Sequence, residues 1–490
     1  MRGNTRATGF AILSLALTCS AQEFHPDIPR AWDDKAVEAL EVPLAQRDRS
    51  PRYMSAEEYY KLKVRPIYRS YAVYVQGREP AGYIEALKQK DPEIVFDPSK
   101  LHTKEDWIAA GRLVFESDTR FSPARALTAD DIPLPASTIS KDGMLPGFGA
   151  RYYIREKGAL ELGVNSCAGC HTRVMPDGSL WEGAQGILFP PRAAALAAKH
   201  ETPDQVRRRL DRFWINFGAP WVMSREEFEA QYTSEEYELQ QAANCCGVLA
   251  RQGTSFSHPV HIPSLIGVQN RKYLDATGLV RNRSIGDLMR YAILNEGLDT
   301  LAHFGDFQPS PHATAFSAEE GTRYTDEQLY ALALYISSLK PPPNPNKFDK
   351  HARRGQVIFQ RQGCVNCHTP PLYTNNRLTP ALGFKIPDDL RKTDDILDIS
   401  LGTDPYLALK TRRGTGFYKV PSLKGVWFRN AFGHGGQADT LEEWFDPARL
   451  KPDYVPKGSH IGPGAIQGHP FGLDLPAADK QDLIAFLKTL

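Results

Sequence analysis

The chain lacks an excess of charge of either sign, since 59 Lys and Arg residues stand against 58 Asp and Glu residues in a length of 490. This balance gives no electrostatic basis for binding nucleic acid or a strongly acidic substrate. Beyond its first twenty residues the chain also lacks an apolar run long enough to span a bilayer, so we expect no membrane span. Its hydrophobic content of 41% is enough to bury two or three domain cores.

The first residues follow the three-part pattern of a secretory signal. Arg2 and Arg6 precede a mostly apolar stretch at 10–17, and small residues at 19–21 come before the polar Gln22. We therefore expect a signal peptide over residues 1–21 and a periplasmic protein if the host is Gram-negative. Lipid anchoring at Cys19 is the alternative, although the three residues before it are a poor lead-in for that processing.

Cysteine is scarce, yet four of the seven cysteines fall in two copies of Cys-x-x-Cys-His, for which about 0.003 accidental matches are expected from this composition. In that pattern two thioethers attach a haem and the histidine is the proximal iron ligand. Zinc binding and a redox dithiol are the alternatives for Cys-x-x-Cys, but the two pairs lie 197 positions apart and each is followed at once by His. The sequence predicts two covalently bound c-type haems (iron), held by Cys167, Cys170 and His171 and by Cys364, Cys367 and His368.

Further landmarks recur in the same order in each half. Gly111-x-x-x-Phe115 precedes the first motif, and Gly355-x-x-x-Phe359 precedes the second. The stretch 263–268 matches 421–426, and two amphipathic segments, 332–339 and 483–490, close the halves. A glycine facing an aromatic side chain lets two crossing helices approach closely, an arrangement that resembles the cytochrome c fold. We therefore expect a mainly α fold with two cytochrome c-like haem domains, long loops and an N-terminal extension.

A proline-rich stretch at 341–348 cannot continue a helix and favours an extended spacer, so we place the domain boundary there. The predicted domains are 106–340 with haem 1 and 349–490 with haem 2. Residues 22–105 form the extension, to which we assign no chemistry. It includes a predicted helix capped by Ser55 and Glu58.

One stretch carries a specific resemblance to a family. Residues 417–436, followed by 440–443, resemble the signature of bacterial di-haem cytochrome c peroxidases, a superfamily that includes the enzyme that matures methylamine dehydrogenase and the rubber oxygenases. Residues 468–475 are more similar to the rubber-oxygenase branch. The likeness covers roughly residues 105–490 and is specific at superfamily level, not at the level of substrate.

The resemblance implies an oxidoreductase that reduces hydrogen peroxide at haem 1, with electrons relayed through haem 2 from a small cytochrome c or cupredoxin. A di-haem oxygenase or protein-modifying oxidase, using oxygen, is the first alternative. A non-catalytic electron-transfer cytochrome, with both irons six-coordinate, is the second. Formation of a homodimer stays open. Calcium, which some relatives bind between their domains, is doubtful because Arg429 and Ala431 stand where Thr and Pro are usual.

Family members pair one six-coordinate haem with one that has an open position. No methionine follows Cys364, so a His/Met haem 2 would need a methionine from the other half. His469, in a Gly-His-x-x-Gly stretch like that of the oxygenase branch, is the preferred sixth ligand of haem 2, with His434 second. Ala276 aligns with His434 in the first half, which favours haem 1 as the reactive one.

A capping ligand for haem 1 is less defined. His312 precedes the first closing helix much as His469 precedes the second, and His258, His261 and His303 rank below it. A solvated loop histidine is the default for each.

Two further residues are expected to take part in the chemistry. Glu182 is the candidate acid/base for splitting the O–O bond, although an ordinary surface carboxylate would look the same. Trp427 is the candidate aromatic residue between the haems, although a buried core tryptophan would look identical. The adjacent Cys245 and Cys246 are expected to form a vicinal disulfide or to stay as thiols, not a metal site.

Overall fold

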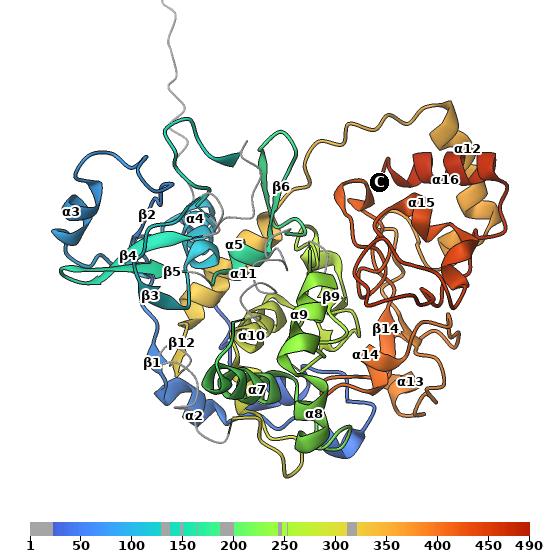
Figure 1. Ribbon diagram of the computed structural model, residues 1–490, viewed down its shortest axis with the longest axis horizontal. Helices are drawn as coiled ribbons and strands as arrows, with labels where there is room; N and C mark the ends of the chain where they lie inside the picture. Colours follow the sequence, from blue (N-terminus) through green and yellow to red (C-terminus); the bar gives the residue numbers. More distant parts are fainter. Residues whose placement is uncertain are drawn as a thin grey trace, which may run out of the picture.

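The protein is described from a computed structural model, which covers residues 23–128, 138–147, 150–163, 165–186, 200–243, 247–251, 253–310 and 321–490. Its two halves lie side by side, and an extended stretch between α11 (Asp326–Ser338) and α12 (Lys350–Arg361) crosses from one to the other (Figure 1). Within that stretch residues 340–349 form neither helix nor strand. Six of these ten are proline or asparagine, which explains why α11 does not continue.

The first half is organised by the crossing of α4 (Lys104–Glu116) and α11. At the crossing point an added Cβ on Gly111 would lie 1.9 Å from the carbonyl oxygen of Ala331, so only glycine fits. One turn along, the rings of Phe115 and Tyr335 lie with centroids 5.2 Å apart. α4 begins at a capping box between Thr103 and Asp106.

The second half repeats this crossing with α12 and α16 (Ala477–Leu487). An added Cβ on Gly355 would lie 1.9 Å from the carbonyl oxygen of Asp482, and the rings of Phe359 and Phe486 lie 5.3 Å apart. The glycine and aromatic landmarks of the sequence repeat therefore occupy equivalent positions in both halves. This confirms the predicted close helix crossing.

The expectation of a mainly α fold holds only loosely, because the first half also contains a four-stranded antiparallel sheet in the order β2-β4-β5-β3. Its strands are Ser70–Tyr71, Arg151–Glu156, Ala159–Gly163 and Phe121–Pro123. Short two-stranded pairs join β6 (Thr172–Val174) to β7 (Leu180–Glu182), β8 (Val248–Leu249) to β9 (Val260–His261), β10 (Tyr273–Leu274) to β11 (Val280–Arg281), and β13 (Leu378–Pro380) to β14 (Phe417–Lys419).

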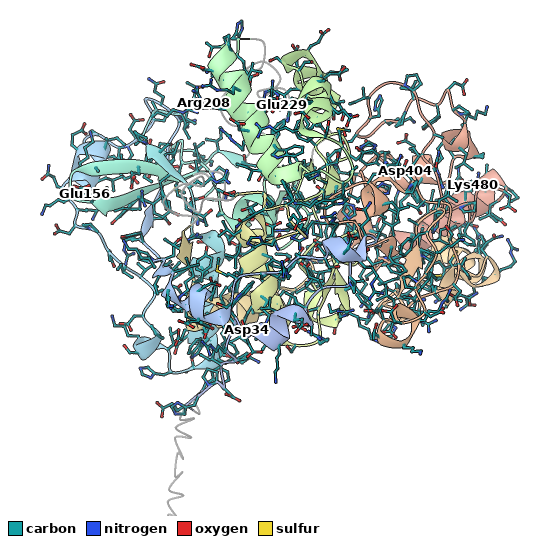
Figure 2. All side chains as sticks on the ribbon, turned by 90° about the horizontal axis from the view of Figure 1, so that it is seen from below. Asp34, Glu156, Arg208, Glu229, Asp404 and Lys480 are labelled. Atoms are coloured by element: carbon teal, nitrogen blue, oxygen red, sulfur yellow. The ribbon has the colours of Figure 1, made fainter. Side chains whose placement is uncertain are left out.

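Other helices surround the two crossings. In the first half they are α5 (Cys167–Cys170), α7 (Pro203–Phe217), α8 (Arg225–Gln231), α9 (Ser234–Ala243) and α10 (Ile285–Asn295). In the second half they are the short helices α13 (Leu390–Thr393), α14 (Tyr406–Leu409) and α15 (Leu441–Trp444). Figure 2 shows Glu156 on the sheet and Lys480 on α16 at opposite ends of the molecule. No described helix is long and apolar enough to cross a membrane.

The N-terminal extension packs on both halves. Its helices are α1 (Asp34–Glu38), α2 (Ala56–Lys61) and α3 (Tyr83–Lys88), and the predicted capping box of Ser55 and Glu58 is present at α2. Strand β1 (Lys63–Val64) pairs in parallel with β12 (Thr322–Arg323) of the first half. The Arg47 side chain forms an ion pair of 2.6 Å with Asp389 of the second half.

Candidate functional site

One cavity of about 640 Å³ is lined by both Cys-x-x-Cys-His motifs. None of the four motif thiols is in a disulfide. Within the described ranges no three His, Cys, Asp or Glu side chains gather into a metal-binding cluster. The lining includes all six motif residues: Cys167, Cys170, His171, Cys364, Cys367 and His368.

The first motif is fixed by its own short helix, α5. The Ser166 hydroxyl caps it by accepting from the backbone N–H of Gly169, and the backbone N–H of His171 donates to the carbonyl of Cys167. The His171 ring nitrogen Nδ1 lies 3.0 Å from the carbonyl oxygen of Pro263. Burial lowers the pKa of His171 to about 4, so the ring is neutral, donates through Nδ1 and keeps Nε2 as a free electron-pair donor.

The second motif has the same design. The backbone N–H of His368 donates to the carbonyl of Cys364 over 2.8 Å, and its Nδ1 lies 3.2 Å from the carbonyl oxygen of Tyr373. His368 is buried, which lowers its pKa. Each motif therefore presents two thiols and one neutral, oriented imidazole to the cavity, which is the donor set that covalent haem requires.

His469 lies opposite His368, with ring centroids 6.3 Å apart and an angle of 51° between the ring planes. Two imidazoles bound to one metal from opposite sides, each through a bond of about 2 Å, have ring centroids about 6 Å apart. Nδ1 of His469 is buried and has no hydrogen-bond partner. The spacing and the neutral, desolvated ring fit a ligand pair around one iron.

The backbone around His469 is held by a buried guanidinium. Arg449 is fully buried, and its Nη2 donates to the carbonyls of Gly468 and His469 over 3.0 and 2.8 Å. Its other nitrogens donate to the carbonyls of Ile466 and Trp444. His469 itself has φ of 49°, a left-handed conformation that non-glycine residues rarely adopt. Arg449 therefore stabilises a strained loop that aims one imidazole into the cavity.

The other candidate histidines have different partners. The ring of His434 lies 4.9 Å from that of Tyr418, and the ring of His258 stacks on Tyr406 at 3.7 Å. Nδ1 of His261 lies 3.1 Å from the carbonyl oxygen of Gly433. In the described part of the chain His171 has no ring contact comparable with that between His368 and His469. His434, the second choice for haem 2, and His261, a lower-ranked candidate for haem 1, line the cavity without facing a motif histidine ring.

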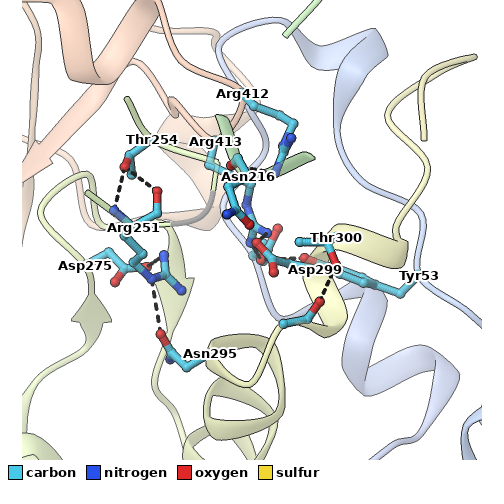
Figure 3. Close-up of polar contacts among 12 residues, drawn as sticks. Tyr53, Asn216, Arg251, Thr254, Asp275, Asn295, Asp299, Thr300, Arg412 and Arg413 are labelled. Carbon is cyan, nitrogen blue, oxygen red and sulfur yellow. Dashed lines mark hydrogen bonds and ion pairs between the residues drawn. The ribbon is translucent and has the colours of Figure 1, made fainter. Parts of the chain in front are cut away.

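A polar network lies beside the cavity in the first half (Figure 3). Asp275 accepts from the Tyr291 hydroxyl over 2.5 Å and from Arg251 over 2.8 Å, and Arg251 also donates to Asn295. All four line the cavity. Asp275 immediately precedes Ala276, the residue that aligns with His434 in the repeat. The repeat alignment therefore singled out the neighbouring position, but the sequence did not identify the Asp275 carboxylate.

The N-terminal extension reaches the same network. Arg413 of the second half is almost fully buried and forms ion pairs with Glu41 of the extension and, over 3.1 Å, with Asp299 of the first half. The Tyr53 hydroxyl donates to Glu41 over 2.8 Å. Three separate stretches of chain thus meet at the Arg413 guanidinium beside the cavity. The sequence did not indicate this role for Arg413.

Glu182 and Trp427 are not among the residues that line the cavity. Glu182 is held at the face of the α4 and α11 crossing, where it pairs with Arg112 over 2.7 Å and accepts from the Tyr335 hydroxyl. This ion pair and hydrogen bond turn the Glu182 carboxylate toward the helix crossing, although its backbone on β7 pairs with Thr172 beside the first motif. The ring of Trp427 instead contacts Trp181 of the first half, with centroids 5.5 Å apart.

Several sequence expectations fall outside the described residues. These are the signal segment with Cys19, the His312 ligand, and the Cys245–Cys246 pair. Arg429 is one of the two residues that made calcium doubtful from the sequence. Its guanidinium lies at the boundary between the halves and donates to the carbonyls of Ser422 and Lys424.

Comparison with known proteins gives a weak but specific similarity. No protein-family model matches the chain. The cytochrome c peroxidase IdrP1 of Pseudomonas sp. (strain SCT) is 24% identical over 227 residues, which cover 41% of this chain and 55% of that protein. The chain thus spans about half the length of this curated relative.

Two solved structures are similar at low scores. One is a MauG-like protein associated with microbial copper homeostasis, at a TM-score of 0.32 and 18% identity, covering 59% of this chain and 88% of that one. The other is the hydrazine synthase of Kuenenia stuttgartiensis, at a TM-score of 0.28 and 17% identity, covering 65% and 98%. These scores are too low to establish a shared fold. The similarity to a cytochrome c peroxidase and the two Cys-x-x-Cys-His motifs agree with the bacterial di-haem cytochrome c peroxidase superfamily.

Proposed function

We propose that the chain is an exported di-haem c-type cytochrome of the peroxidase type, with one haem in each of the domains 106–340 and 349–490. It reduces hydrogen peroxide at haem 1 with electrons that pass through haem 2 from a small donor protein, a cytochrome c or a cupredoxin. The curated similarity to a cytochrome c peroxidase and the paired motifs support this proposal. His171 and His368 are the proximal ligands.

The observation that carries the proposal is the inequivalence of the two motif histidines. His368 faces the His469 ring at 6.3 Å, whereas His171 has no such ring contact within the described ranges. A haem held from both sides suits electron transfer, and one with an accessible side suits a small oxidant. The haem groups, when bound, supply the redox-active iron at which peroxide is reduced.

Two residues that line the same cavity as His171 can hold a proton there. The Tyr291 hydroxyl donates to Asp275, whose other oxygen is bonded by Arg251, so a proton on the tyrosine oxygen has a fixed acceptor beside it. Burial raises the pKa of Tyr291, which keeps the hydroxyl protonated at neutral pH. We therefore assign proton handling to Asp275 and Tyr291, in preference to Glu182, which is outside the cavity lining.

Trp427 remains the candidate for electron passage, now together with Trp181. Trp181 lies on β7, which pairs with the strand that follows the first motif, and Trp427 lies on a short 3-10 helix (Val426–Phe428) in the second half. Their edge-to-face contact joins the halves through two aromatic rings. Trp427→Phe should slow reduction of haem 1 by pre-reduced haem 2, measured by stopped-flow absorption, while leaving both haem spin states unchanged.

Electron paramagnetic resonance of the oxidised and half-reduced protein, combined with peroxide turnover using a reduced donor, tests the function. We expect one low-spin and one high-spin haem, with peroxide consumed in step with donor oxidation. Two low-spin haems that respond to neither peroxide nor cyanide would instead support a pure electron carrier.

Variants separate the proton pair from general damage. Asp275→Asn and Tyr291→Phe should lower kcat for peroxide by about 10²-fold or more, the usual contribution of general acid–base catalysis. Asp395→Asn is the matched control, because this half-exposed carboxylate pairs with Lys272 away from the cavity lining. Unchanged kcat in both cavity variants would refute the assignment.

A further inference from the structure

Three partly buried basic residues lie where the two halves meet: Arg271, Lys419 and Arg429. The two arginines are equivalent in the internal repeat, each eight residues after the proline that opens it, at Pro263 and Pro421. The equivalence extends to their hydrogen bonds. Arg271 donates to the carbonyls of Ser264 and Ile266, and Arg429 donates to those of Ser422 and Lys424.

Lys419 occupies the position equivalent to His261. The backbone N–H of Lys419 donates to the carbonyl of Ala276 over 3.1 Å, and that of His261 donates to the carbonyl of His434 over 3.1 Å. These reciprocal bonds relate the two halves by an approximate twofold symmetry. The side chains break it, because one half presents an ammonium group and the other a neutral imidazole.

None of the three cations forms an ion pair within the described part of the chain. The arginines bond only to backbone carbonyls, and Nε of Arg429 is buried without a partner. Asp275, already bonded by Arg251 and Tyr291, acts on Lys419 only at longer range.

Buried charges of this kind are costly unless a counter-charge is supplied. Burial lowers the pKa of Lys419 to about 7 and those of Arg271 and Arg429 to about 10. Two guanidinium groups, and an amino group that burial brings close to losing its proton at neutral pH, thus lack the negative groups that would stabilise their charged forms. A ligand with negative charge is the direct way to supply them.

A second cavity, of about 40 Å³, lies among these groups and shares Lys419 and Arg429 with the main cavity. No Asp or Glu side chain is among its lining residues, and the hydroxyl of Ser422 and the amide of Asn376 add polar atoms. Its volume is enough for a few waters or one carboxylate group. Its chemistry suits an anion and opposes a divalent cation.

We propose that Arg271, Lys419 and Arg429 form an anion site that takes a haem carboxylate group, so that this interface needs no calcium. The inference rests on the proposed function only in requiring covalently bound haem. It holds whether the reaction is peroxide reduction or electron transfer alone. The cations would offset carboxylate charge that a divalent ion would otherwise neutralise.

Resonance Raman spectroscopy of the haem-loaded protein tests the site, because the bending mode of haem propionates responds to their hydrogen-bonding partners. Lys419→Met and Arg429→Gln should each shift that mode. Lys424→Met is the matched control, since it removes the same charge from an exposed position on the same loop. An unchanged propionate mode in folded Lys419→Met and Arg429→Gln would overturn the proposal.

Wild-type protein gives a second test that needs no variant. Addition of calcium or of a calcium chelator should leave the Raman and absorption spectra unchanged, and a calcium-dependent change would overturn the proposal. Replacing phosphate buffer by a buffer without small oxyanions, at constant ionic strength, should also have no effect. A phosphate-dependent shift of the spectra would assign the cavity to a free oxyanion and refute the haem carboxylates.

Discussion

The imidazole rings of His368 and His469 face each other across 6.3 Å, although 101 positions separate them in the chain. His368 is oriented by a local carbonyl of Tyr373, and His469 by a loop whose carbonyls Arg449 holds. One ring therefore comes from a rigid local motif and the other from a tertiary arrangement. Variants at haem 2 can therefore test the tertiary arrangement around His469 separately from the local motif of His368.

His469→Ala should convert the low-spin signal of haem 2 to a high-spin one, because it removes one of two facing imidazoles. The readout is electron paramagnetic resonance of the oxidised protein, and haem content should be unchanged since both cysteines remain. His460→Ala is the control, because the His460 ring bonds to the Gly458 carbonyl and is not in the cavity lining. A low-spin signal that persists in His469→Ala would show that another residue is the ligand.

Arg449→Gln should weaken the binding of His469 to haem 2 without changing the histidine itself. It removes hydrogen bonds from one buried guanidinium to four carbonyls, which should cost about 3 kcal/mol of unfolding free energy. In folded Arg449→Gln we expect cyanide to displace the ligand of haem 2 more readily than in wild type, measured by absorption titration. Lys451→Gln, at an exposed neighbouring position, should behave as wild type.

Asp118 should make stability depend on pH. Burial raises its pKa to about 6, whereas the unfolded carboxyl titrates near 3.9. Below about pH 4 both states are protonated. As pH rises from about 4 to 6 only the unfolded state loses its proton, so stability falls by up to about 3 kcal/mol.

Asp118→Asn removes this titration and can still accept the Tyr153 hydroxyl. The free energy of unfolding of Asp118→Asn minus that of wild type should be larger at pH 7 than at pH 4, as measured by denaturant unfolding. Asp91→Asn, at an exposed site paired with Lys157, is the control. An equal effect of Asp118→Asn at both pH values would contradict the prediction.

Gly111→Ala and Gly355→Ala should each destabilise the protein by several kcal/mol, because a new Cβ would overlap a carbonyl oxygen of the crossing helix at 1.9 Å. The two effects should be similar, since the crossings are equivalent. Gly464→Ala should be nearly neutral, because nothing lies within 4 Å of its Cβ position. Thermal unfolding of the three variants checks the prediction.

The helix crossings could be predicted from sequence because their determinants are local and repeated. Gly111 and Gly355 each stand four residues before an aromatic, and both crossings follow that spacing. The four-stranded sheet was missed because its strands are short and because the paired residues of β2 and β4 lie 81 and 83 positions apart in the chain. Hydrophobic periodicity carries little signal for strands of two to six residues.

The residues of the candidate site likewise divide into those that a local sequence pattern predicts and those that only tertiary packing brings together. The Cys-x-x-Cys-His residues are contiguous, so their grouping was predictable, and His469 could be proposed from its local Gly-His pattern. Asp275 and Tyr291, which line the cavity, and Arg449, which holds the loop of His469, could not be found, because tertiary packing alone brings them to the site. Glu182 illustrates the converse: it is close in sequence to His171, but Arg112 and Tyr335 hold it at a helix crossing.

The pairing of Arg413 with Glu41 and Asp299 bears on how the protein can be produced. A chain that started at residue 106 would keep the guanidinium in its interior and lose one of its two carboxylates. A recombinant fragment of this kind, with both haem domains but without the extension, would leave Arg413 with Asp299 as its remaining ion-pair partner among the described residues. Insolubility of such a fragment would reflect the lost ion pair and would say nothing about whether haem had been attached.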